Sequence, residues 1–219
     1  MIVYSAIFGS HDLPKPPRPH PNVSEWLLFT DDPAVYAPGW RVVVEPVVSE
    51  TTPRMQAKWR KCHPPRQADE SLYLDGSIRL RDPGLLDAAI EALTSADWAM
   101  FRHPERSDVY AEALASAPMP KYDGAPLKAQ IEAYEAASSI EHLSRLPLWA
   151  AGILARRHTP KVLEASHAWY VECAQWTAQD QISLPVVLDR FGIVPAALEA
   201  GGDLWNNRHF SVEPHQKPT

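Results

Sequence analysis

The sequence predicts an α/β domain with a mostly parallel central sheet flanked by helices on both faces. In the first half of the chain, short apolar segments alternate with longer segments of helical spacing, which is the pattern of β-α-β units. A length of 219 residues favours one domain over two. The 45% of hydrophobic residues can form a sizeable core. We therefore expect residues 1–219 to form a single domain.

The predicted strands are short apolar runs bounded by Gly, Pro, Asp or Ser. In chain order they span residues 2–8, 26–30, 40–44, 72–74, 98–101 and 148–155. A proline-rich segment, residues 14–21, separates the first two strands. Proline has no backbone donor and restrains the residue before it, so this segment is predicted to be a surface loop.

The predicted helices have apolar residues at spacings of three and four. They span residues 53–62, 82–93, 107–117, 125–138, 162–176 and 182–191. Pro53 fits the first turn of the first helix, and Asp82 is the predicted N-cap of the second. Residues 203–219 have no clear pattern and are expected to pack across the domain surface as a C-terminal tail.

Charge, cysteine content and hydropathy exclude several classes of protein. The 21 Lys and Arg against 27 Asp and Glu give a net charge of -6, which argues against a broad nucleic-acid surface. Cys62 and Cys173 lack the spacing of a zinc site or a disulfide framework. With no leader peptide and no apolar run of membrane-spanning length, we expect a soluble cytoplasmic protein.

Polar residues follow several apolar segments, at positions that the predicted topology brings to one edge of the sheet. They are Asp31 and Asp32, Asp75 and Ser77, residues 103–106, and Asp180 with Gln181. Ligands of open α/β sheets bind outside the carboxyl ends of the strands, so several such groups favour a ligand site. Singly, each could be purely structural, because Asp75-Gly76 is also a turn signal and Asp180 could cap a helix.

Positive charge near this edge could bind phosphate. Arg54, Lys58 and Lys61 recur along one predicted helix, where they either face phosphate oxygens or form a solvated surface. The chain has no Walker loop and no GxGxxG motif, so phosphates would need side chains and a metal ion. Near the C-terminus, His209, His215 and Lys217 either fold back over that site or are inert tail residues.

Eight sequence segments in order resemble the glycosyltransferase family once known only as domain of unknown function 616, whose plant members act in cell-wall polysaccharide assembly. They are residues 4–9 with Asp12, Phe29-Thr30-Asp31-Asp32, Arg54 with Lys58, Tyr73-Leu74-Asp75-Gly76-Ser77-Ile78, residues 101–106 with Tyr110 and Glu112, Gln130 with Tyr134, residues 156–158, and residues 180–183. The family resembles retaining GT-A transferases of the glycogenin and galactosyltransferase type. A GT-A-like single domain is therefore expected.

The resemblance assigns metal and phosphate roles. Asp75 corresponds to the DxD motif that binds Mn²⁺ or Mg²⁺, with Ser77 in place of the second acid. His209 or His215 resembles the late histidine that completes the metal site, and Lys217 resembles the lysine that contacts the diphosphate. Such a metal bridges the diphosphate of a nucleotide sugar and stabilises charge on the departing nucleotide.

The resemblance also implies a donor pocket and catalytic residues. The expected nucleotide-binding residues are Ile7, Phe8, Gly9 and Asp31, with Arg54 and Lys58 facing the phosphates. Asp180 and Gln181 resemble the Asp-Gln pair beside the anomeric carbon, which implies retention of configuration without a dedicated general base. His103 and Arg106 are expected to hold the sugar or the acceptor.

Together these features predict a metal-assisted glycosyltransferase that moves a hexose or pentose from a nucleotide diphosphate sugar, with a UDP-sugar favoured, to a hydroxyl group of a glycan or small molecule. One alternative places the acceptor on hydroxymethylated bases of DNA, as in phage-type modification. Another is a nonenzymatic carbohydrate-binding protein on a GT-A fold, an idea that the serine at position 77 keeps open.

Overall fold

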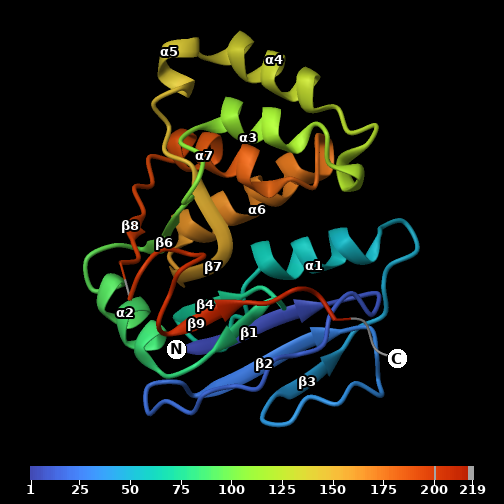
Figure 1. Cartoon of the computed structure of the whole chain (residues 1–219), viewed down its shortest axis with the longest axis vertical. Coiled ribbons are helices and arrows are strands. Elements are labelled where there is room, and N and C mark those ends of the chain that lie inside the picture. The colour runs from blue at the N-terminus through green and yellow to red at the C-terminus, as the bar shows by residue number, and fades with distance from the viewer. Residues whose placement is uncertain (200, 217–219) are drawn as a thin grey trace.

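Seven strands form one central sheet in the computed structural model, which describes residues 1–199 and 201–216 (Figure 1). The order across the sheet is β3-β2-β1-β4-β7-β6-β8. The strands are β1 (Ile2–Ile7), β2 (Glu25–Thr30), β3 (Arg41–Val44), β4 (Glu70–Leu74), β6 (Trp98–Arg102), β7 (Trp149–Arg157) and β8 (Ala196–Ala197). Only β7 pairs antiparallel with its neighbours, so the mostly parallel sheet expected from the sequence is confirmed.

Helices cover the sheet and extend beyond it. They are α1 (Pro53–Cys62), α2 (Gly84–Ala92), α3 (Val109–Ser116), α4 (Leu127–Ala137), α5 (Ile140–Leu143), α6 (Pro160–Gln175) and α7 (Asp180–Arg190), with the 3₁₀ turn η1 (Pro120–Tyr122). The side chains of Thr52, Asp108 and Thr159 cap α1, α3 and α6 by accepting from backbone N–H groups of the first turn. The polar residues before these helices therefore define where they begin.

Helix α2 begins two residues later than predicted. The Asp82 carboxylate accepts from the N–H of Gly84 at 2.8 Å, so it closes a turn ahead of the helix and Pro83 occupies the N-cap position. Because Asp side chains bond to the backbone two residues on in turns as well as in helix caps, the sequence pattern alone did not separate the two.

Alternating side chains along the strands divide the core into two layers. In β1, Tyr4 packs with α1, α6 and α7 on one face, while Val3 packs with α2 on the other. Successive strand residues point to opposite faces, and both faces here are apolar. The sheet is therefore buried on both sides, which accounts for strands that read as continuous apolar runs.

A third apolar cluster lies outside the sheet. It joins α3, α4 and α5 to Ile182 of α7 through Val109, Leu127 and Leu143. Figure 1 shows α3, α4 and α5 stacked beyond α6 and α7, at the opposite end of the molecule from β3. This helical layer is thus attached to the sheet mainly through α7.

The C-terminal segment returns to the carboxyl end of β4. Strands β5 (Ile78–Leu80) and β9 (Phe210–Val212) form a separate two-stranded antiparallel sheet, although they are 130 positions apart in the register Leu80↔Phe210. Beyond β9, the N–H of Glu213 donates to the carbonyl oxygen of Ser77 at 2.8 Å. Strands of this length are too short for a periodic pattern, so the sequence did not predict them.

The helices within residues 1–199 and 201–216 are all either too short or too polar to cross a membrane.

Replacing Leu72 with alanine is expected to destabilise the fold. Leu72 lies in β4 and is fully buried in the layer covered by α2. Loss of its side chain leaves a cavity, and we expect a loss of about 2–5 kcal/mol in the free energy of unfolding, measured by urea denaturation. Leu114→Ala, at a side chain that is 78% exposed, is the control and should change stability by less than about 0.5 kcal/mol. Equal effects of the two substitutions would contradict the assigned core.

Candidate functional site

Two lysines of α1 meet the first residue of α7. Lys58 and Lys61 are one turn apart on the same face of α1, and both ammonium groups bond to Oδ2 of Asp180, Lys61 at 2.7 Å. The side chains of Lys61 and Asp180 are 3% and 5% exposed. A buried charge is tolerated only when it is paired, so this ion pair fixes α1 against α7.

The pairing shifts the pKa values of both groups. Burial raises the pKa of Asp180, but the ammonium groups of Lys58 and Lys61 outweigh burial and hold it well below its ordinary value. Burial lowers the pKa of Lys61, but Asp180 and then Asp75 raise it above its ordinary value. Both groups are therefore charged throughout the neutral range.

Asp75 is the accessible carboxylate of this group. It follows β4, its side chain is 38% exposed, and its Oδ1 accepts from the Tyr73 hydroxyl at 2.7 Å and lies 3.7 Å from Nζ of Lys61. Its N–H donates to the carbonyl oxygen of Gly152 at 2.8 Å. A Cβ at Gly152 would lie 3.2 Å from Oδ2 of Asp75, so the glycine leaves room for the carboxylate. One carboxylate oxygen is thus held in place while the group stays open to solvent.

A buried arginine holds the C-terminal end of α1. Arg156 of β7 is fully buried and donates to the carbonyl oxygen of Lys61 at 2.6 Å and to Oγ of Ser166 at 3.2 Å. The Tyr4 hydroxyl donates to the same Lys61 carbonyl at 3.0 Å, and burial raises the pKa of Tyr4 to about 12. The backbone of Lys61 is therefore as firmly held as its side chain.

A cavity of about 270 Å³ opens at the carboxyl ends of β1 and β2. Its lining is Ile7, Ser10, Asp12, Leu13, Thr30, Asp32, Ala34, Val35 and Tyr36. It adjoins the end of β4, because a Cβ at Gly76 would lie 3.3 Å from both Asp12 and Ile7. The cavity and Asp75 therefore lie at the ends of the neighbouring strands β1 and β4, at the same edge of the sheet.

The predicted nucleotide residues lie at this end of the sheet in different environments. Ile7 lines the cavity, whereas Phe8 is buried in the core beneath α1. The N–H of Gly9 donates to both carboxylate oxygens of Asp31, at 2.9 and 3.1 Å, so Asp31 holds the loop and Asp32 faces the cavity. Gly9 has φ +64°, and a Cβ there would lie 2.8 Å from Pro53, so glycine permits the close approach of α1.

The two C-terminal histidines lie at opposite ends of the β5–β9 pair. His209 precedes β9 and its Nδ1 lies 2.6 Å from Oδ1 of Asp82, at the end of β5 remote from Asp75. His215 follows β9, and its Nδ1 lies 2.7 Å from Oδ2 of Asp12, which lines the cavity. Only His215 therefore lies on the Asp75 side. Lys217 is outside the described residues.

The donor atoms near Asp75 suit a metal ion that is shared with a ligand. Among residues 1–199 and 201–216, no three His, Cys, Asp or Glu side chains are grouped to hold an ion. Asp12 already accepts from Lys15 at 2.9 Å and from two backbone N–H groups. Mg²⁺ is commonly bound through one or two carboxylates together with substrate phosphates, so the Asp75 carboxylate, with Ser77 close by, fits that mode rather than an all-protein cage.

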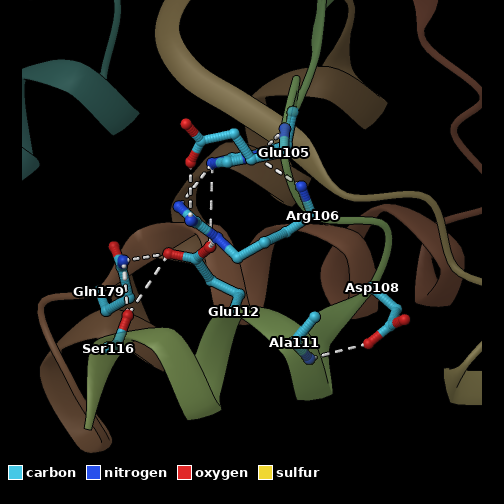
Figure 2. A network of polar contacts seen from close by, with 8 residues as sticks. Glu105, Arg106, Asp108, Ala111, Glu112, Ser116 and Gln179 are labelled. Atoms are coloured by element: carbon cyan, nitrogen blue, oxygen red, sulfur yellow. Dashed lines mark hydrogen bonds and ion pairs between the residues drawn. The ribbon is translucent and has the colours of Figure 1, made fainter. Parts of the chain in front are cut away.

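His103 and Arg106 belong to a neighbouring internal network, of which Figure 2 shows Arg106, Glu112, Ser116 and Gln179. Arg106 contacts Glu112, whose side chain is 1% exposed. Nη2 of Arg106 also lies 2.7 Å from Nε2 of His103. Burial and then Arg106 lower the pKa of His103. Gln179 donates to Glu112 and, at 3.0 Å, to Oγ of Ser116.

This network anchors the start of α7 to α3, because Gln179 immediately precedes Asp180. His103 and Arg106, which were predicted to hold the sugar or acceptor, are thus linked through Glu112 to Gln179, the residue before Asp180. Gln181 follows in the first turn of α7 and is half-buried.

The structure adds two residues with no assigned role in the sequence analysis. Tyr36 lines the cavity, and Lys121 of η1 lies near Arg54 and Lys58 of α1. Asp32, which the sequence analysis had grouped with Asp31 at this edge of the sheet, also lines the cavity. No pattern pointed to Tyr36 or Lys121, because both lie in irregular segments far from their partners in sequence.

The sheet order, the acid at the end of β4 and the buried acid that begins α7 define a GT-A-like α/β domain. The family model for the TOD1/MUCI70 glycosyltransferase-like domain matches residues 32–200, which is well over half of the chain. The chain belongs to this family, and the resemblance inferred from the sequence is confirmed.

A curated relative is named "Probable hexosyltransferase MUCI70", from Arabidopsis thaliana. It is 29% identical over 219 residues, an alignment that covers 87% of this chain and 37% of that protein. The chain therefore spans little more than a third of the length of this relative.

Replacing Asp180 with asparagine should destabilise the protein by about 3–5 kcal/mol at neutral pH, because it leaves buried Lys61 without its main partner. The folded-state pKa of Asp180 lies below the unfolded value of about 3.9, so its contribution is present above that value and is lost as pH falls toward the folded pKa. Urea denaturation of both proteins should show a constant stability difference from about pH 6 to 8 and a smaller one below about pH 4.

Asp189→Asn is the matched control, since Asp189 is on the same helix with a side chain 44% exposed and pairs with His142. It should cost less than about 1 kcal/mol. An Asp180→Asn protein as stable as this control would contradict the inferred ion pair.

Proposed function

We propose that this chain is a glycosyltransferase that moves a hexose from a nucleotide diphosphate sugar to a hydroxyl acceptor. The observation that carries the proposal is the cavity at the ends of β1 and β2, with the exposed carboxylate of Asp75 at the end of the neighbouring strand β4. Membership of the glycosyltransferase-like family supports it, as does the hexosyltransferase name of the relative.

The cavity suits the nucleoside part of such a donor. Tyr36 is 85% exposed and offers an aromatic surface for a base, while the Asp32 carboxylate can accept from hydroxyl or ring N–H groups. Small-molecule sites combine an apolar lining with a few polar groups in this way. A UDP-sugar is the first donor to test.

The diphosphate would then lie between Asp75 and α1. Arg54 and Lys58 carry positive charge that can stabilise the departing nucleotide, and Lys58 is held in position by Asp180. Mn²⁺ or Mg²⁺, held by Asp75 with help from Ser77 or His215, would supply further stabilisation of that charge.

The reaction breaks the bond between the anomeric carbon and a phosphate oxygen and forms one between that carbon and the acceptor oxygen. The acceptor proton passes to the departing phosphate, so no separate general base is required. Because Asp180 is buried and paired with two lysines, its role would be to position Lys58 and Lys61 beside the sugar. Gln181, next along α7, would face the sugar, and retention of configuration is expected.

The acceptor would approach from the side of the helical layer. The Arg106 and Glu112 network fixes the 103–106 segment and the start of α7 relative to each other, which would shape that side of the site (Figure 2). A pocket of fixed shape is required because discrimination between sugars depends on single hydroxyl groups.

Donor turnover provides the direct test. The purified chain is incubated with a panel of nucleotide diphosphate sugars and Mn²⁺, and release of the nucleotide diphosphate is measured with and without sugar and glycan acceptors. We expect one donor to be turned over, and Asp75→Asn to reduce the rate by about 10²–10³-fold, because it would weaken binding of the metal ion that stabilises charge on the departing nucleotide.

Asp87→Asn is the control, because Asp87 lies on α2, on the other face of the sheet, with its side chain 69% exposed. It should leave turnover unchanged. Binding of a sugar without turnover of any donor would favour a carbohydrate-binding protein, and full turnover by Asp75→Asn would refute the assigned role of Asp75.

A further inference from the structure

Three cationic side chains converge where α1 meets η1. Arg54 donates from Nη1 to the carbonyl oxygen of Lys121 at 3.1 Å. The guanidinium carbon of Arg54 and Nζ of Lys121 lie 4.7 and 5.0 Å from the ring centroid of Tyr122. Lys58 lies one turn along α1 from Arg54 and bonds to Asp180. We call Arg54, Lys58 and Lys121 the cationic cluster.

The positive charge of the cationic cluster exceeds the negative charge of the carboxylates paired with it. Within the described part of the chain, Lys58 is paired with Asp180, whereas neither Arg54 nor Lys121 lies within ion-pair distance of a carboxylate. Burial, and then Arg54 and Lys58, lower the pKa of Lys121. Like charges held together without a counterion raise the free energy of the protein, and an anion bound between them would lower it.

We propose that Lys121 is a further binding residue of the donor site and that the cationic cluster holds phosphoryl oxygens of the donor diphosphate. This inference rests on the proposed function and adds to it a residue from the helical layer, 63 positions beyond Lys58 in sequence. Lys is a suitable phosphate ligand because its ammonium group is a compact point charge with three donors.

The placement of α1 favours phosphate as the anion. Pro53, at the start of α1, packs against Gly9 at the end of β1, beside the proposed nucleoside cavity. Lys61, near the other end of α1, reaches Asp75. Arg54 and Lys58 lie on the helix that links these two points, and Lys121 lies beside it, so a diphosphate that extends from the nucleoside toward Asp75 would pass the cationic cluster.

Arg54 also stabilises the geometry that presents Lys121. Its bond to the Lys121 carbonyl and its contact with the Tyr122 ring hold η1 against α1, although η1 belongs to the helical layer. An anion bound by Lys121 of η1 and by Arg54 and Lys58 of α1 would add a second connection between η1 and α1. Binding should therefore stabilise the protein as well as neutralise the cationic cluster.

Inorganic pyrophosphate is the probe, because it requires neither the correct base nor the correct sugar. Its dissociation constant is measured by titration calorimetry in EDTA, at two salt concentrations, for the wild type, Lys121→Met and the control Lys128→Met. Lys128 lies on α4, with its side chain 90% exposed, and its substitution removes the same charge. We expect Lys121→Met to weaken binding about tenfold, equivalent to about 1.4 kcal/mol, and Lys128→Met to leave it unchanged.

The salt dependence separates a binding role from a structural one. Loss of a phosphate contact should make the affinity of Lys121→Met less sensitive to salt than that of the wild type, whereas a folding defect would not. Lys121→Arg should recover most of the affinity. Equal pyrophosphate affinity in the wild type and Lys121→Met, or no binding by the wild type, would overturn the proposal.

The same variant distinguishes failure of this inference from failure of the proposed function. Donor turnover that is equal in the wild type and Lys121→Met would refute the role of Lys121 and leave the glycosyltransferase proposal standing. Pyrophosphate binding that depends on Lys121, without turnover of any nucleotide sugar, would support the anion site and count against the transferase.

Discussion

The buried ammonium group of Lys61 is the constraint on which the rest of the site depends. A charge at this depth requires partners, and here they come from three separate elements: Asp180 of α7, Asp75 after β4, and the Trp169 ring of α6, whose centroid lies 5.7 Å from Nζ of Lys61. Neutral replacements could pack this space at lower cost in desolvation. That the chain keeps charges here indicates that the arrangement of α1, β4 and α7 is specified by the polar contacts as well as by the apolar core.

Two glycines allow the backbone to approach as closely as this arrangement needs. Gly9 lets α1 pack against the end of β1, and Gly152 leaves space for the Asp75 carboxylate beside β7. In both places a side chain would meet its neighbour at or inside normal contact distance. The course of the backbone at Gly9 and Gly152 therefore helps to determine where the end of β1 and the Asp75 carboxylate lie.

Much of the fold followed from the sequence, because burial on both faces of the sheet leaves continuous apolar runs and because Pro53 marks the first turn of α1. The end of β4 was also found in this way, since an apolar run that ends abruptly on Asp75 is typical of a buried strand that reaches the sheet edge. The pairing of β5 with β9 and the approach of Lys121 to α1 were not found. Both depend on contacts between segments far apart in sequence, about which local patterns carry no information.

Strand β7 touches both ends of this site. Gly152 accepts from the backbone of Asp75, and Arg156, four residues along, holds the last turn of α1. Since strand residues rise about 3.3 Å each, Gly152 and Arg156 are about 13 Å apart along the strand, and the Arg156 side chain points toward α1. The strand therefore fixes the distance between the two contacts. Insertion of a single residue between positions 152 and 156 would turn the Arg156 side chain to the opposite face of the sheet, so we expect homologous chains to vary the side chains of this segment but never its length.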